Sequence, residues 1–252
     1  MASVKTLREY IANPMGDGTA VFTNRAVMRD FYSRKFDALL LRENGVLDTR
    51  VYKDGNRYLV HIKVPSEKVE KFYYDTVYEF TREKNTDIKV EDYRMRFFSN
   101  DPSFIYTFAY AAKKDDLLIK ELYPKVGKMA LEQKPRETNP HVVMGYIKSI
   151  YFGYLYMFIK NMLKSTVLDT MAKKYEAKSF LNSIRQAEEV ILARQQAAHE
   201  QHKKNAISRA VTRNNPNTTN KVATTSMVSN TKLTKSIKSS KKPRLTKLIR
   251  KI

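Results

Sequence analysis

Glu200 is the last acidic residue of this 252-residue chain, and the residues after it carry 14 of the 47 lysines and arginines. A segment with charges of one sign repels itself and buries too little apolar surface to fold alone. The folded part must therefore come from the residues before it, whose length suits one well-buried domain. We expect a globular body over residues 1–204, ending in a helical region, and a disordered basic arm over residues 205–252.

Composition excludes several classes of protein. The absence of cysteine excludes disulfides, cysteine-based zinc sites and a thiol nucleophile. The amino-terminal residues lack the apolar core of a secretory signal. The most hydrophobic stretch, residues 149–159, is bounded by Lys148 and Lys160, and it is shorter than the roughly 20 residues of a membrane-spanning helix. We expect a soluble protein that makes no membrane contact.

The first clear element is a helix over residues 24–43. Its apolar residues recur at helical spacing, Asn24 can cap its start, and Asn44-Gly45 can end it.

The pattern then changes from helical to alternating. Two alternating runs, residues 46–52 and 57–64, flank the sequence Lys53-Asp54-Gly55-Asn56. Asp-Gly between such runs predicts a tight hairpin in which both central residues take a positive φ. Three more runs rich in β-branched and aromatic residues predict strands, and they read KFYYDTVYEF, DYRMRFF and SFIYTFAYAA. We therefore predict an α+β fold with an antiparallel sheet of about five strands over roughly residues 46–111, covered by the 24–43 helix.

Helical patterns return from Asp115. The run to residue 133 is interrupted at Pro124, and the run over residues 141–165 is apolar nearly all round, which favours burial. Residues 166–202 predict a long amphipathic helix with a break near Lys178-Ser179.

The arm carries the clearest functional signal. Each of its cations can neutralise one phosphate, and the release of counterions then gives sequence-independent affinity that falls steeply with salt. The alternative is a solvated tail that only aids solubility, but such a tail has no need to exclude every acid. The candidate residues for nucleic-acid or partner binding are Lys203, Lys204, Arg209, Arg213, Lys221, Lys232, Lys235, Lys238, Lys241, Lys242, Arg244, Lys247, Arg250 and Lys251.

The last ten residues, PRLTKLIRKI, have a further pattern. One helical face would be apolar and the other cationic, with Pro243 suited to the first turn. The apolar positions, at i, i+3, i+4 and i+7, are Leu245, Leu248, Ile249 and Ile252. A helix this short needs a partner to form, so we expect it to dock in a groove of a neighbouring subunit or, less favourably, on a membrane surface. Chance patterning is the competing interpretation.

Two aromatic clusters, residues 72–80 and 151–156, could stack nucleic-acid bases. Such residues more often belong to a core, and we assign both clusters to it.

Enzyme signatures are sparse. The sequence NPMGDGT neither follows a strand nor leads into Gly-Lys-Ser/Thr, so it is not a phosphate-binding loop. His199 and His202 lack the spacing of a zinc protease and read as surface residues. A metal-dependent nuclease needs converging carboxylates, and the candidates on predicted strands are Asp75, Glu79, Glu91 and Asp92. Because Asp75 and Glu79 alternate with aromatic residues, we place them on the solvent side and predict no catalytic centre, metal or cofactor.

Four stretches carry a resemblance to known proteins: YIANPMGDGTAVFTNRAVM, RYLVHIKVPSE, FYYDTVYEF and RFFSNDPSFIYTFAYAA. Over roughly residues 1–160 the sequence resembles virion structural proteins of tailed bacteriophages with A+T-rich genomes. The resemblance implies a non-enzymatic, homo-oligomeric component of the virion, assembled in the host cytoplasm. It would lie at the head-to-tail junction or inside the capsid, contacting other virion proteins and packaged DNA.

Three functional hypotheses remain. The first is this virion component, with the arm on DNA or on a neighbouring subunit. The second is a free nucleic-acid-binding protein of phage replication or transcription, and the third is a metal-dependent nuclease.

Overall fold

The fold comes from a computed structural model that describes residues 5–12, 25–67, 69–83, 89–184 and residue 200. Contacts divide the chain into two units, Met1–Val190 and Ile191–Ile252. The fold described below is that of the first unit. The expected boundary at residue 204 and the whole basic arm lie outside the described residues.

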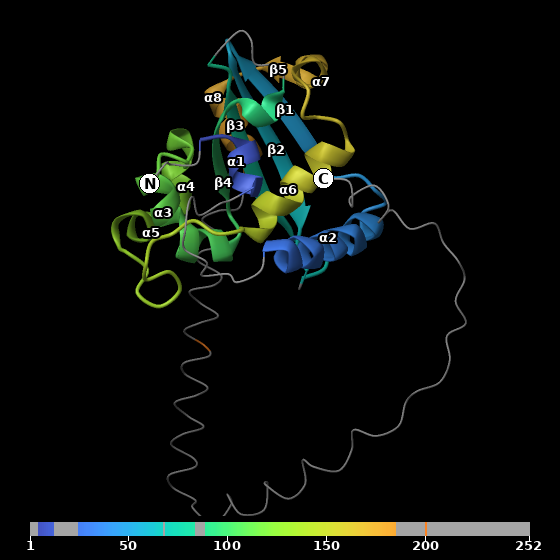
Figure 1. The fold of residues 1–252 in the computed structure, drawn as a ribbon. Coiled ribbons are helices and arrows are strands. Elements are labelled where there is room, and N and C mark those ends of the chain that lie inside the picture. Colours follow the sequence, from blue (N-terminus) through green and yellow to red (C-terminus); the bar gives the residue numbers. More distant parts are fainter. Residues whose placement is uncertain (1–4, 13–24, 68, 84–88, 185–199, 201–252) are drawn as a thin grey trace, which may run out of the picture. The chain divides into compact units, whose positions relative to one another are not determined.

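A five-stranded sheet forms the centre of the first unit (Figure 1). Its strands are β1 (Thr49–Asp54), β2 (Arg57–Pro65), β3 (Tyr73–Thr81), β4 (Arg94–Ser99) and β5 (Ala172–Lys174). The spatial order is β4-β3-β2-β1-β5. The first four strands form an antiparallel meander, and β5 pairs with β1 in parallel. The predicted α+β class is confirmed, but the sheet is mixed rather than purely antiparallel.

The β1–β2 hairpin is present, although its turn differs from the prediction. Asp54 pairs with Arg57, so the loop residues are Gly55 and Asn56. Of these two, only Gly55 has a positive φ, 58°. A positive φ at the first loop residue alone is typical of a type II′ turn, which glycine at that position favours.

The predicted strand over residues 103–112 is wrong. This segment forms a π-helical turn, η2 (Phe104–Phe108), followed by α3 (Ala109–Lys114). Its apolar run is continuous, and such a run fits a buried helix as well as a strand. The segment could not join the sheet as a further strand, because the outer edge of β4 is already hydrogen-bonded to other residues. The amide of Met95 donates to the Lys5 carbonyl and that of Phe97 to the Leu117 carbonyl, both at 2.7 Å.

Two helices cover one face of the sheet. They are α6 (Lys148–Ile159), which contacts β2, β3 and β4, and α1 (Leu7–Ala12), whose Tyr10 ring lies 5.5 Å from that of Phe97. Figure 1 shows α6 lying across the sheet. The burial predicted for this segment is confirmed, but the helix begins at Lys148 rather than near residue 141.

The predicted first helix is confirmed as α2 (Arg25–Arg42), and Asn44 and Gly45 end it with φ values of 54° and 76°. Its main partner is α6 rather than the sheet, with the rings of Phe36 and Phe152 5.7 Å apart. The expected cap, Asn24, lies outside the described residues.

The long helix predicted over residues 166–202, with a break near Lys178-Ser179, is also wrong in its described part. The chain forms α7 (Ser165–Met171), then β5, then α8 (Ala177–Ser183). The break comes at residues 172–176 because Ala172–Lys174 pairs with β1. Phe180 of α8 contacts Tyr52, which the strand register places on the sheet face opposite α6. Residues 185–199, the rest of that prediction, lie outside the described part.

Short elements make up the remainder. They are η1 (Val90–Asp92), η3 (Lys120–Leu122), α4 (Tyr123–Val126) and α5 (Lys128–Glu132). The helix predicted to break at Pro124 breaks instead at Gly127, where φ is 88°, while Pro124 sits in the first turn of α4. Within the described residues, none of these helices has the length and apolar character needed to cross a membrane.

Candidate functional site

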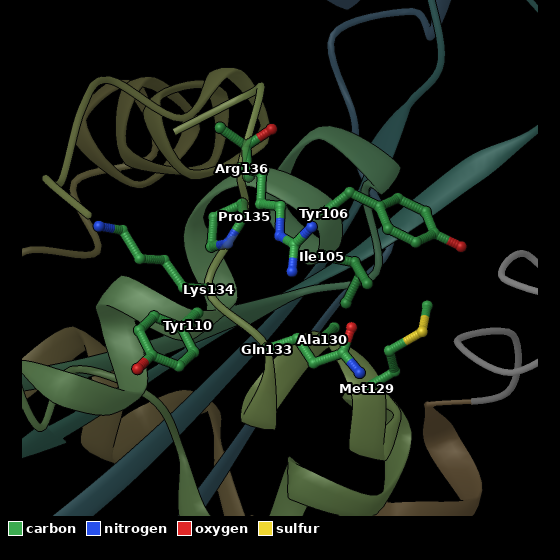
Figure 2. A pocket seen from close by; sticks show the side chains of 10 residues that line it. Ile105, Tyr106, Tyr110, Met129, Ala130, Gln133, Lys134, Pro135 and Arg136 are labelled. Carbon is green, nitrogen blue, oxygen red and sulfur yellow. The ribbon is translucent and has the colours of Figure 1, made fainter. Parts of the chain in front are cut away.

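The described residues form a groove of about 640 Å³. One wall comes from η2 and α3, and the other comes from α5 and the segment that follows it (Figure 2). The lining residues, which we call the η2–α5 groove, are Ile105, Tyr106, Thr107, Tyr110, Met129, Ala130, Gln133, Lys134, Pro135 and Arg136. This volume lies within the usual range of ligand sites, about 300–1,000 Å³.

The groove has a fixed wall because the segment after α5 is tied to η2. The Thr138 hydroxyl donates to the Tyr106 carbonyl at 3.1 Å, and the side-chain amide of Asn139 donates to the Thr107 carbonyl at 3.0 Å. The π-helical turn widens the helix at this point, and such turns are frequent at functional sites.

Asn139 also closes its own loop. Its side chain donates to the Val143 carbonyl at 2.8 Å and accepts from the Val143 amide at 3.1 Å. The side chain is buried, so these hydrogen bonds are shielded from water. Asn139 therefore holds in place the segment that follows Lys134 and Arg136.

The groove carries positive charge that the described part of the chain does not neutralise. Lys134 and Arg136 are exposed, and neither forms an ion pair within the described residues. None of the lining residues is acidic. In Figure 2 the Arg136 guanidinium points into the groove, with Tyr110 on one side and Tyr106 on the other.

These side chains select for one type of ligand. Guanidinium and ammonium groups bind oxyanions, tyrosine rings offer flat surfaces for stacking, and the Gln133 amide can donate and accept hydrogen bonds. Met129 adds an exposed, adaptable apolar contact. The η2–α5 groove is therefore suited to an anion that also carries a flat ring.

A second polar group lies on the sheet face opposite α6, where Glu79 is the central residue. Its carboxylate accepts from Arg57 at 3.2 Å and from Arg96 at 3.1 Å. Arg57 also pairs with Glu121, and Arg96 also pairs with Asp116. The hydrogen bond from Arg96 lowers the pKa of Asp116. Burial is the largest single effect on Glu121 and alone would raise its pKa, but the hydrogen bond and charge of Arg57, with smaller contributions that include Arg96, together lower that pKa.

The third polar group is fully buried. His61 Nε2 lies 2.8 Å from Asp75 Oδ1, while the Asn100 side chain donates to Asp75 Oδ2 at 2.9 Å. The Asp75 amide in turn donates to the Asn100 side chain at 2.8 Å. The Asp75 and Asn100 contacts tie the end of β4 to β3.

The placement of Asp75 and Glu79 on the solvent side is therefore wrong, because each is only 3% exposed. Both still alternate with the aromatic residues of β3, but the face they occupy is covered. The role of His61 was missed as well. Its only sequence signal was a polar residue within an apolar strand.

The four nuclease candidates do not converge on one point. Glu91 and Asp92 lie in η1 rather than on a strand, and both pair with Arg8. The carboxylates of Asp75 and Glu79 face histidine, asparagine and arginine. Among the described residues, no group of three or more potential metal ligands is placed to hold an ion.

The aromatic clusters assigned to the core are buried over residues 151–156, as predicted. Of residues 72–80, Tyr78 and Phe80 are buried, while Phe72 is partly exposed. The 14 candidate cations after Glu200, the four docking positions of the arm, His199 and His202 all lie outside the described residues.

Sequence reasoning missed the η2–α5 groove. Tyr106 and Tyr110 lie in a segment that was predicted to be a strand. In a strand, their spacing of four residues does not indicate that both would line a groove. The one available signal was the short basic sequence Lys134-Pro135-Arg136 between helical patterns, and its neighbour in space could not be read from the sequence.

Comparisons of the chain with protein-family models, with curated proteins and with solved structures found no match.

Proposed function

We propose that the chain is a non-enzymatic structural component of a tailed-phage particle, at the head-to-tail junction or in the capsid interior. The body assembles with copies of itself and with other virion proteins. The basic arm binds packaged DNA or a neighbouring acidic subunit.

One observation carries the proposal, which is the division of charge along the chain. The residues after Glu200 hold 14 cations and no anion, whereas the residues up to it hold 33 cations and 26 anions. A segment of that kind needs a polyanion, and packaged DNA is the most concentrated one in a particle. As a flexible coil the arm would span about 40 Å, so it could reach beyond the body that bears it.

The test uses the full chain with the 14 cations after Glu200, those of the arm together with Lys203 and Lys204, changed to glutamine. We expect the unmodified protein to bind duplex DNA with an affinity that falls steeply with salt. The slope of log K against log salt should approach about −12 if every arm cation contacts a phosphate. The glutamine variant should lose most of this affinity and most of its salt dependence.

A matched variant keeps every charge but removes the apolar stripe. It carries serine at Leu245, Leu248, Ile249 and Ile252. DNA affinity should survive in this variant, whereas docking onto a neighbouring subunit should be lost.

The location of the protein distinguishes the virion component from a free nucleic-acid-binding protein. Mass spectrometry of purified heads and tails should find the chain in the particle. Its absence from both would favour the free nucleic-acid-binding protein. Equal DNA and particle retention by the intact and glutamine forms would contradict the role of the arm.

A further inference from the structure

We propose that the η2–α5 groove binds an unpaired stretch of nucleic acid, stacking bases on Tyr106 and Tyr110 and holding phosphates with Lys134 and Arg136. This site belongs to the body, and it does not depend on the charge of the arm.

The positive charge points to an anion. Lys134 and Arg136 line the groove from one short segment, and no described carboxylate pairs with either. Their sequence neighbours Glu132 and Glu137 do not line the groove. Elsewhere in the body the arginines that line the sheet are already neutralised, as Arg57 and Arg96 are by Glu79. The groove thus keeps cations available for a ligand.

The tyrosines point to a ligand with flat rings. Tyr106 and Tyr110 are only half-buried, unlike the core tyrosines of α6, and both line the groove. Aromatic side chains beside a cationic track are the usual platform for single-stranded nucleic acid, because every base has a face that can stack. The Arg136 guanidinium, which also lines the groove, can itself stack on a base.

An unpaired strand fits better than a duplex or an acidic peptide. In a duplex the base faces are covered by neighbouring bases, so the tyrosines could reach only its backbone. An acidic peptide would use Lys134 and Arg136, but it would leave the two tyrosine rings without a matching surface. The rings and the cations together favour unpaired nucleotides.

The first experiment maps the contact. A single-stranded oligonucleotide of about ten residues, within the usual site size of about 4–16 nucleotides, carries 5-iodouracil and is cross-linked to the full-length protein by light. Mass spectrometry should find cross-links on Tyr106 or Tyr110. Cross-links that fall only on the arm would overturn the proposal.

The second experiment measures affinity, in the full chain with the arm cations changed to glutamine so that the arm does not mask the groove. Tyr106→Leu and Tyr110→Leu should each weaken binding of the base-containing strand by at least about fivefold. Binding of an abasic strand of equal charge should not change. Arg136→Gln should lower the salt slope by about 0.7.

Matched controls remove the same groups elsewhere. Lys173→Gln with Lys174→Gln removes two exposed cations from β5, outside the groove, and Tyr74→Leu removes a half-buried tyrosine at the start of β3. None of these control variants should weaken binding of the base-containing strand as much as the groove variants do. Circular dichroism checks each fold. Because Lys134 and Arg136 are exposed, their variants keep the test valid if a tyrosine variant unfolds.

Three results would each contradict the inference. They are equal binding of base-containing and abasic strands, equal binding of single and double strands, and tighter binding of a polyglutamate peptide. The last would make the groove a site for an acidic protein segment. Failure here leaves the role of the arm intact, because the arm variant is measured separately.

Discussion

At the scale of single residues, Gly153 of α6 packs closely against Tyr78 of β3. A Cβ atom on Gly153 would lie 2.5 Å from Tyr78 Oη and 2.9 Å from its Cε2. The Tyr78 ring is fully buried, its hydroxyl donates to the Ile150 carbonyl, and burial raises its pKa well above the usual value. The helix can approach the sheet this closely only because Gly153 has no side chain.

We therefore expect Gly153→Ala to lower the free energy of unfolding by about 1–3 kcal/mol, the usual cost of overpacking. This loss should occur although alanine is the better helix former. Urea denaturation measures it. The control is Ser149→Ala on the same helix, where the hydroxyl is buried without a partner among the described residues, so its removal should cost little.

Tyr78→Phe should partly rescue Gly153→Ala, because it removes the nearest atom, the hydroxyl oxygen. The remaining ring carbon at 2.9 Å keeps the rescue incomplete. Alone, Tyr78→Phe should cost about 1 kcal/mol for its lost hydrogen bond. The double variant should then lose less stability than the two single variants added together, and strict additivity would show that the contact is not strained.

At the scale of elements, charged side chains fasten the outer parts of the body to the sheet. Glu79 joins β3 to β2 and β4 through Arg57 and Arg96, and Asp169 of α7 joins that helix to β1 through Lys53. These links differ in burial, since Glu79 is 3% exposed and the Asp169 side chain is 45% exposed. Their contributions to stability should differ accordingly.

Glu79→Gln should lower the free energy of unfolding by about 2–4 kcal/mol, because it leaves two guanidinium groups without their shared anion. Both arginines are partly exposed, which keeps the loss below that of a fully buried pair. The comparison is Glu83→Gln, which breaks an exposed pair with Arg94 at 3.6 Å. That change should cost less than about 1 kcal/mol. Equal losses would mean that burial of Glu79 has no energetic consequence.

Stability should also fall in acid. Hydrogen bonds from Lys53 and Tyr58 lower the pKa of Asp169, and the bond from Arg8 lowers that of Asp92. A lowered folded-state pKa means that the contribution is present above the unfolded pKa, about 3.9 for aspartate. It is then lost as the pH falls further, through the folded-state pKa.

Denaturation in urea at a series of pH values between about 5 and 2 measures this decline. Asp169→Asn should make it shallower. Glu132→Gln, which removes an exposed carboxylate with no ion pair in the described part of the chain, should leave the slope as in the parent protein. An unchanged slope in Asp169→Asn would contradict the assignment.

At the scale of the whole molecule, we propose that the body and the arm have separate roles. The ion pairs described above lie within the body, from Arg8 in α1 to Asp169 in α7, and none of them needs the arm. In the proposed function, the arm supplies charge for a partner and the body supplies the fold that carries the arm. Stability and DNA binding should therefore respond to different substitutions.

Changing all 14 cations after Glu200 to glutamine should shift the free energy of unfolding of the body by less than about 0.5 kcal/mol, as expected for surface changes. The same variant should lose most of its DNA affinity. Urea denaturation and DNA titration on one preparation give both values. A large loss of stability would mean that the arm packs on the body, and the proposed division would then be wrong.

The sequence by itself determined features whose causes are local. The hairpin follows from Gly55 between alternating runs, the end of α2 follows from Asn44-Gly45, and burial of α6 follows from its apolar surface. The charge division is also local, because it is a property of composition. The hairpin and the helix end could each be read within about ten residues, the range over which periodicity and turn chemistry act.

Only the tertiary structure decided which segments pair. The apolar run at residues 103–112 is helical because other residues are hydrogen-bonded along the edge of β4. Ala172–Lys174 is a strand because it pairs with β1 at the other edge of the sheet. The η2–α5 groove and the His61–Asp75–Asn100 cluster join residues far apart in the chain. Periodicity indicates that a residue is buried, but it does not indicate which residue it contacts. These features all depend on such contacts between distant parts of the chain.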